Sequence, residues 1–260
     1  MPFACIFVPN FPVAAVFRAE PELRARAVAI FEGKPPLEKV FAVNESAGRM
    51  GIAPGMTKAQ AELCSEVTLC PRSLLQESAA HAALLDCAQS FSPCAEDAAA
   101  DAAILDLAGM ESLFGTLPEI ACAIFRRAAD LGLDANVAVA SNPDAAALAA
   151  RGISGVIVIP PGKEAEQLGL LPIEVLFPDR EEGNEQKKEA TRLLETMERW
   201  GIRTGKPGSC WTPESRPPCE RPRVRPKKSL ANAEGSIATA RRATGQGCRR
   251  GFSLAFLPWS

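Results

Sequence analysis

The sequence lacks the features of membrane, secreted and zinc-binding proteins. No apolar run approaches the ~20 residues that a membrane span needs. Prolines interrupt an apolar N-terminus that has no basic segment before it, which argues against a secretory signal. The nine cysteines form no C-x-x-C pair, and His81 is the one histidine that could join them in a zinc site. We therefore expect a cytoplasmic protein with reduced, mostly buried cysteines and no membrane contact.

Charge divides the chain into two parts of opposite sign. Residues 1–204 carry 18 Lys and Arg against 28 Asp and Glu, whereas residues 205–260 carry 11 against 3. The second part also contains seven prolines and six glycines, and it shows no lasting helix or strand periodicity. Such a segment cannot bury enough apolar area to offset the entropy of ordering it. We expect a disordered basic tail after Thr204.

Three interpretations of this tail stay open. Its basic residues could neutralise nucleic-acid phosphates and release counterions, which would give nonspecific binding. The tail could also be merely solvated. The abrupt change of composition at Thr204 is, thirdly, what a reading-frame change or a truncation in the coding DNA would generate.

Hydrophobic periodicity before the tail predicts an α+β fold. β and α patterns alternate in the order typical of a ferredoxin-like unit, with helices on one face of an antiparallel sheet. Strands are expected at 3–8, 27–31, 39–43, 91–95, 103–107, 137–140 and 155–159. Helices are expected at 11–18, 44–50, 57–64, 73–90, 117–131, from 142 onward, at 164–170 and at 185–200.

Four ordered segments resemble one known family. Residues 6–12 with 21–24 match its opening segment, and residues 51–56 match its signature G-[VI]-x-x-G-M. Residues 91–96 and 105–115 match the stretch around its second catalytic strand. In this order and spacing they resemble the Y-family (UmuC-type) translesion DNA polymerases. The resemblance implies a ferredoxin-like palm at 1–10 and 73–163, an inserted small fingers unit at 11–72, and a partial helical thumb at 164–204.

The departures from the family pattern lie at its catalytic positions. Nucleotidyl transfer needs carboxylates that hold two Mg²⁺ ions, and aligned by position two of these acids fall on Phe7 and Ala102. Asp101 is the one that remains. The tyrosine and arginine that reach the incoming triphosphate fall on Glu45 and Gly48. We therefore expect no catalytic residue, no cofactor and no bound metal ion, with Asp101 as the weak residual candidate.

This pattern is similar to the ImuB-like, catalytically deficient branch of the family. The resemblance implies a non-catalytic adaptor in DNA repair and damage-induced mutagenesis. It implies contact with a mutagenesis polymerase subunit, with a RecA-like accessory protein and, weakly or nonspecifically, with DNA. The family's C-terminal segments do not follow Thr204, which leaves contact with the sliding clamp in doubt.

Two alternatives remain from the residues themselves. One is a low-activity translesion polymerase that uses Mg²⁺ held by Asp101 with Glu96 or Asp106. The other is a truncated product whose tail binds nucleic acid nonspecifically. His81 falls on the long amphipathic helix at 73–90, where a structural role is expected.

Overall fold

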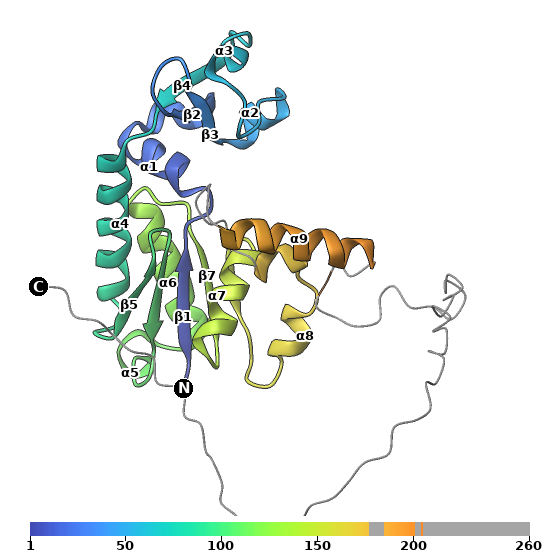
Figure 1. The fold of residues 1–260 in the computed structure, drawn as a ribbon. Coiled ribbons are helices and arrows are strands. Elements are labelled where there is room, and N and C mark those ends of the chain that lie inside the picture. Colours follow the sequence, from blue (N-terminus) through green and yellow to red (C-terminus); the bar gives the residue numbers. More distant parts are fainter. Residues whose placement is uncertain (177–184, 201–203, 205–260) are drawn as a thin grey trace, which may run out of the picture. The chain divides into compact units, whose positions relative to one another are not determined.

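The computed structural model describes residues 1–176, 185–200 and 204, and these residues form two β-sheets joined by helices (Figure 1). The predictions made for the tail at 205–260, namely disorder, nucleic-acid binding and a frameshift origin, lie outside the described residues. Among those described, no helix combines the length and the hydropathy that a membrane span requires.

The larger sheet has five strands with β1 at its centre. β1 runs antiparallel to both of its neighbours, β6 and β7, while β8 lies parallel to β7 at one edge and β5 lies antiparallel to β6 at the other. The strands are β1 (Phe3–Phe7), β5 (Ala95–Ala99), β6 (Ala102–Asp106), β7 (Asn136–Ala140) and β8 (Val156–Val158).

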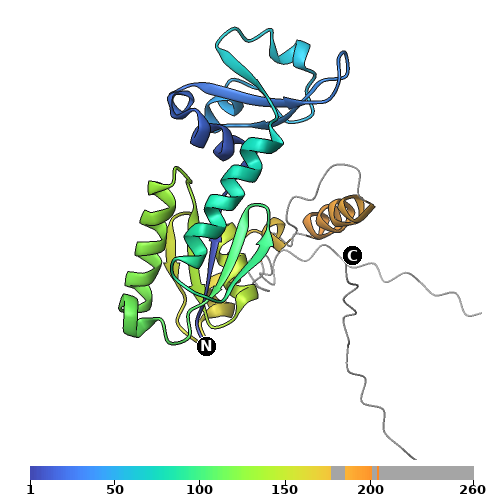
Figure 2. The same ribbon diagram turned by 90° about the vertical axis from the view of Figure 1, so that its left-hand side faces the viewer.

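Alternation along β1 divides its side chains between two cores. Ala4 and Ile6 point to the face covered by α4 (Leu74–Gln89) and α6 (Leu117–Asp130). Cys5 and Phe7 point to the opposite face, which packs against α7 (Pro143–Gly152) (Figures 1 and 2). The end of β1 at Phe7 therefore lies under α7.

The smaller sheet has three strands in the order β3-β2-β4. β2 pairs antiparallel with β3 and parallel with β4. Helix α1 connects β1 to this part of the chain and also packs on α4. The elements here are α1 (Phe11–Ala19), a 3-10 turn at Pro21–Ala25, β2 (Ala27–Glu32), β3 (Lys39–Val43), α2 (Glu45–Arg49), α3 (Lys58–Ala61) and β4 (Val67–Pro71).

The remaining described elements are three short ones and one long helix. The short ones are α5 (Glu111–Phe114), α8 (Glu164–Leu168) and a 3-10 turn at Ile173–Leu176, and the long helix is α9 (Glu185–Arg199). α8 begins where the sequence predicts a helix, and α9 covers the predicted helix at 185–200 apart from its last residue.

The α+β prediction is confirmed. The expected antiparallel sheet with helices on one face is wrong, because β8 is parallel to β7 and α7 packs on the face opposite α4 and α6. Individual elements also differ from the prediction. The strand expected at 91–95 is wrong, because β5 begins only at Ala95. Ser92 causes the shift: its hydroxyl donates to the Asp106 carbonyl at 2.6 Å and accepts from the Cys94 amide at 3.1 Å, so its side chain organises a turn. Strand β4 (Val67–Pro71) was not predicted at all.

Asn44 holds the start of α2, and its loss is expected to be costly. Its Oδ1 accepts from the amides of Ala47 at 2.9 Å and Val28 at 3.0 Å, and its Nδ2 donates to the Arg26 carbonyl at 2.7 Å. We expect Asn44→Ala to lower the free energy of unfolding by about 2 kcal/mol, since it removes a helix cap and two further backbone contacts. Urea unfolding measures this change.

Asn44→Asp is the matched control, because it keeps both accepted bonds, loses the donated one and sets a carboxylate oxygen against the Arg26 carbonyl. It should lose less stability than Asn44→Ala, because the bonds to the Ala47 and Val28 amides remain. Equal losses in the two variants would contradict a role for the accepting oxygen.

Candidate functional site

The three positions that the resemblance assigns to metal-binding acids lie at one end of the five-stranded sheet. Phe7 is the last residue of β1 and pairs with Ala102, the first residue of β6. Asp101 precedes β6 in a turn, where its carbonyl oxygen accepts a 2.8 Å hydrogen bond from the Val8 amide. The register of β1 against β6 therefore brings together an aromatic residue, an alanine and one aspartate.

An arginine that the sequence analysis missed adds positive charge at this end of the sheet. Arg151, in the last turn of α7, places its guanidinium carbon 5.9 Å from the centre of the Phe7 ring. Two residues before Phe7, burial raises the pKa of the Cys5 thiol to about 12, while Arg151 lowers this pKa and Asp101 raises it. The site thus holds one guanidinium and one carboxylate close to a buried, protonated thiol.

The other acids of the polymerase alternative lie elsewhere on the sheet. Asp106 is at the far end of β6, roughly 13 Å along the strand from Ala102. Its carboxylate accepts a 2.9 Å hydrogen bond from the Ala108 amide, which is a turn contact. Glu96 is an exposed residue of the edge strand β5. Within the part of the chain that the structure describes, no three His, Cys, Asp or Glu side chains are grouped as metal ligands.

The two positions that the resemblance assigns to triphosphate contacts lie on α2. The Glu45 carboxylate forms an ion pair with Arg49 one turn later, and the two side chains are 80% and 74% exposed. A Cβ atom added at Gly48 would meet no other atom within 4 Å. Packing therefore does not require glycine at this position, and what α2 presents is a carboxylate with its own cationic partner.

His81 connects α4 to the turn that carries Asp101. Its Nδ1 lies 2.9 Å from the Ala100 carbonyl oxygen and its Nε2 lies 3.1 Å from Oδ2 of Asp97. These contacts hold the β5–β6 connection against the helix. They give the histidine the structural role that its place on the predicted helix indicates.

Comparison with known proteins places the chain among polymerase relatives. A family model described as impB/mucB/samB matches residues 6–151, more than half of the chain. DNA polymerase IV of Dehalococcoides mccartyi strain CBDB1 is 32% identical over 177 residues, which cover 64% of this chain and 44% of that protein. DNA polymerase IV 2 of Mesorhizobium japonicum is 30% identical over 162 residues, which cover 61% and 38%. The chain spans less than half the length of these relatives.

Solved structures share the fold at low sequence identity. The insertion ternary complex of Dbh DNA polymerase superposes with a TM-score of 0.62 at 19% identity, covering 78% of this chain and 59% of that one. DinB from Sulfolobus solfataricus gives a TM-score of 0.60 at 17% identity, covering 78% and 58%. The α+β architecture expected from the sequence is that of these polymerases.

The comparisons overturn the prediction that no cofactor is involved. The relatives are named DNA polymerases, and polymerases use paired divalent metal ions to clamp the attacking and leaving oxygens. The sequence argument admitted Mg²⁺ only for the polymerase alternative, because two of the acid positions carry no carboxylate. The family therefore implies Mg²⁺.

The donors at the three acid positions do not fit a pair of metal ions. Phe7 and Ala102 carry no side-chain oxygen. Asp101 is the residue that would hold a single Mg²⁺ together with nucleotide phosphates. A two-metal transfer step cannot be assembled from this set of side chains.

Motif order, fold and family match all lead to one assignment. The matched region contains the whole three-stranded sheet and runs from the end of β1 into the last turn of α7, so it includes Phe7, Asp101 and Arg151. The chain therefore belongs to the impB/mucB/samB family, the UmuC-type or Y-family that includes DNA polymerases of DNA damage tolerance.

Proposed function

We propose that this chain acts in DNA damage tolerance as an adaptor without nucleotidyl transfer, like the ImuB-like branch that its sequence resembles. One observation carries the proposal: the pairing of Phe7 with Ala102 leaves two of the three acid positions without an oxygen. Asp101 alone provides a carboxylate there.

The charges around these positions support the same function. Transfer of a phosphoryl group is stabilised by metal cations, and carboxylates of the protein must hold these cations in place beforehand. The Arg151 guanidinium beside Phe7 repels a further divalent cation. On α2, Glu45 stands where the family places a contact to the triphosphate, and its carboxylate pairs with Arg49 and has no proton to donate to a phosphate.

The two sheets correspond, in this proposal, to the palm and the fingers. The five-stranded sheet with its helices is the palm (1–10 and 73–163), and the three-stranded sheet lies within the fingers (11–72). α8 and α9 begin the thumb (164–204). The proposed partners are DNA, a mutagenesis polymerase subunit and a RecA-like accessory protein, and the proposed location is the cytoplasm.

Primer extension with Mg²⁺ or Mn²⁺ tests the proposal directly. We expect the full chain to extend a primed template no faster than its Asp101→Ala variant purified in the same way. Asp106→Ala is the matched control, because it removes a carboxylate from the far end of β6. Extension that survives in Asp106→Ala and is lost in Asp101→Ala would establish the low-activity polymerase instead.

That polymerase is the second candidate function, and the retention of Asp101 next to Phe7 favours it. Single-nucleotide insertion is its most sensitive readout, because one Mg²⁺ held by Asp101 and the nucleotide phosphates would still bind the nucleotide. Nonspecific nucleic-acid binding by the tail is tested by comparing the full chain with residues 1–204 at increasing salt.

A further inference from the structure

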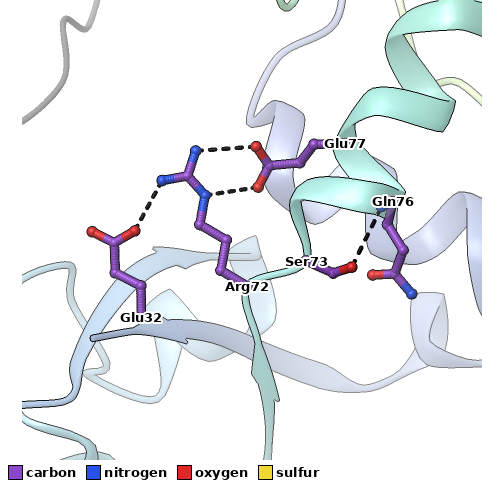
Figure 3. A network of polar contacts seen from close by, with 5 residues as sticks. All are labelled: Glu32, Arg72, Ser73, Gln76 and Glu77. Atoms are coloured by element: carbon purple, nitrogen blue, oxygen red, sulfur yellow. Dashed lines mark hydrogen bonds and ion pairs between the residues drawn. The ribbon is translucent and has the colours of Figure 1, made fainter. Parts of the chain in front are cut away.

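A dense polar network lies where the three-stranded sheet passes into α4 (Figure 3). Arg72 is the first residue after β4, and its guanidinium binds both oxygens of Glu77, with Nε–Oε1 at 2.8 Å and Nη2–Oε2 at 3.0 Å. Its Nη1 donates to Oε2 of Glu32 on β2 at 2.9 Å. One side chain thus joins the first turn of α4 to the three-stranded sheet.

Aromatic stacking and the backbone complete this junction. The Arg72 guanidinium carbon lies 3.9 Å from the centre of the Phe41 ring on β3. The Arg72 amide donates to the Phe31 carbonyl at 2.8 Å. Ser73, the next residue, caps α4 by accepting from the Gln76 amide at 3.4 Å. The chain is therefore held on both sides of the point where β4 ends and α4 begins.

The network is sheltered enough to matter energetically. The side chains of Arg72, Glu77 and Glu32 are 21%, 14% and 40% exposed. The hydrogen bond to Glu77, against an opposing effect of burial, raises the pKa of Arg72 above its usual range. Bidentate, charge-assisted contacts of this kind impose direction as well as attraction.

We propose that Arg72 is a positioning residue that fixes the direction of α4 relative to the three-stranded sheet. With Glu77, Glu32 and Phe41 all engaged, residues 71–73 do not act as a hinge. The three-stranded sheet and the first turn of α4 are then held in one orientation by the contacts of this single side chain. This inference is independent of whether the chain transfers nucleotides.

Distance measurements between two spin labels test this rigidity in the full chain. We would encode p-acetylphenylalanine at two positions and couple a nitroxide spin label to each ketone. The positions are Leu63, which is 87% exposed and follows α3, and Gln89, the exposed last residue of α4. The encoded ketone leaves the native cysteines unlabelled. α4 is about 24 Å long, so a small change in its direction changes the distance between the two labels measurably.

We expect a narrow distance distribution in the unmodified chain and one about twofold broader in Arg72→Ala, as for a released hinge. Arg72→Lys should give an intermediate width, because lysine keeps the positive charge but cannot bind both oxygens of Glu77 through a planar guanidinium or stack on the Phe41 ring. Arg49→Ala is the matched control: it removes an exposed ion pair within α2 and should leave the distribution narrow.

Two results would overturn the inference. One is a distribution in the unmodified chain as broad as that of Arg72→Ala. The other is a distribution that stays narrow when Arg72 is lost. Circular dichroism verifies that each variant is folded. Should Arg72→Ala fail to fold, Glu77→Gln serves in its place, because it removes one charge at constant shape and must broaden the distribution.

Discussion

The double variant Phe7→Asp/Ala102→Glu is expected to bind Mn²⁺ at least about tenfold more tightly than the unmodified chain. Both substitutions lie at the end of the sheet where Asp101 precedes β6. They turn one carboxylate into three, and the affinity of a site for hard cations rises with the number of charged oxygen ligands. Titration followed by electron paramagnetic resonance of free Mn²⁺ measures the gain.

Further substitutions show whether the three carboxylates act as a single site. Adding Asp101→Asn to the double variant should remove the gain, and Asp106→Asn, at the other end of β6, should leave it intact. Arg151→Gln should raise the affinity further, because it removes a positive charge from beside position 7. If Asp101→Asn has no effect on the gain, the aspartate does not share a metal with the introduced acids.

Elements with a strong local signal could be predicted from the sequence. Asn44, Thr57 and Ser73 were all read as helix starts, and in the structure each side chain accepts a hydrogen bond from an amide in the first turn. The end of β1 was predicted within one residue, because its apolar run stops at Pro9. Helix caps and strand ends of this kind are determined by residues that are close in sequence, and they can therefore be predicted from the sequence.

The charged part of the candidate site could not be predicted in the same way. A helix starting near Asn142 was expected, and its alanines at 145, 146, 149 and 150 are indeed buried against the sheet. The place of Arg151 over Phe7 follows from how α7 crosses β1, which no spacing within either segment reveals. At about 3.6 residues per turn, Arg151 falls on the side of α7 opposite the buried alanines, so helical periodicity alone would not have placed it over Phe7.

The residues that α4 buries were also predicted only in part from the sequence. The spacing of Leu74, Ala79, Leu84, Leu85 and Ala88 indicates an apolar side that begins with Leu74. In the structure Leu74 is 69% exposed, and the buried residues are Ala80, Ala83, Leu84, Cys87 and Ala88. Small side chains form most of this face because α4 packs closely on both the sheet and α6. Leucine spacing therefore predicted the helix and misplaced its inner face.

Leu84→Ala is consequently expected to destabilise the fold far more than the same change at an outer leucine. Leu84 is fully buried in the core between α4 and the five-stranded sheet, so its truncation should cost about 3–5 kcal/mol. Leu75 lies on the same helix and is 85% exposed, and Leu75→Ala should change stability by less than about 0.5 kcal/mol. Urea unfolding of both variants, at equal m-values, measures the difference.

The pair is informative because the change in helix propensity from leucine to alanine is small at both positions. Alanine is a slightly better helix former than leucine, so any loss at Leu84 reflects the cavity that truncation leaves behind. Similar losses at Leu84 and Leu75 would mean that both leucines are buried, and hence that α4 turns a different face to the sheet. A large loss at Leu84 alone would confirm that α4 turns the face containing Leu84 toward the five-stranded sheet.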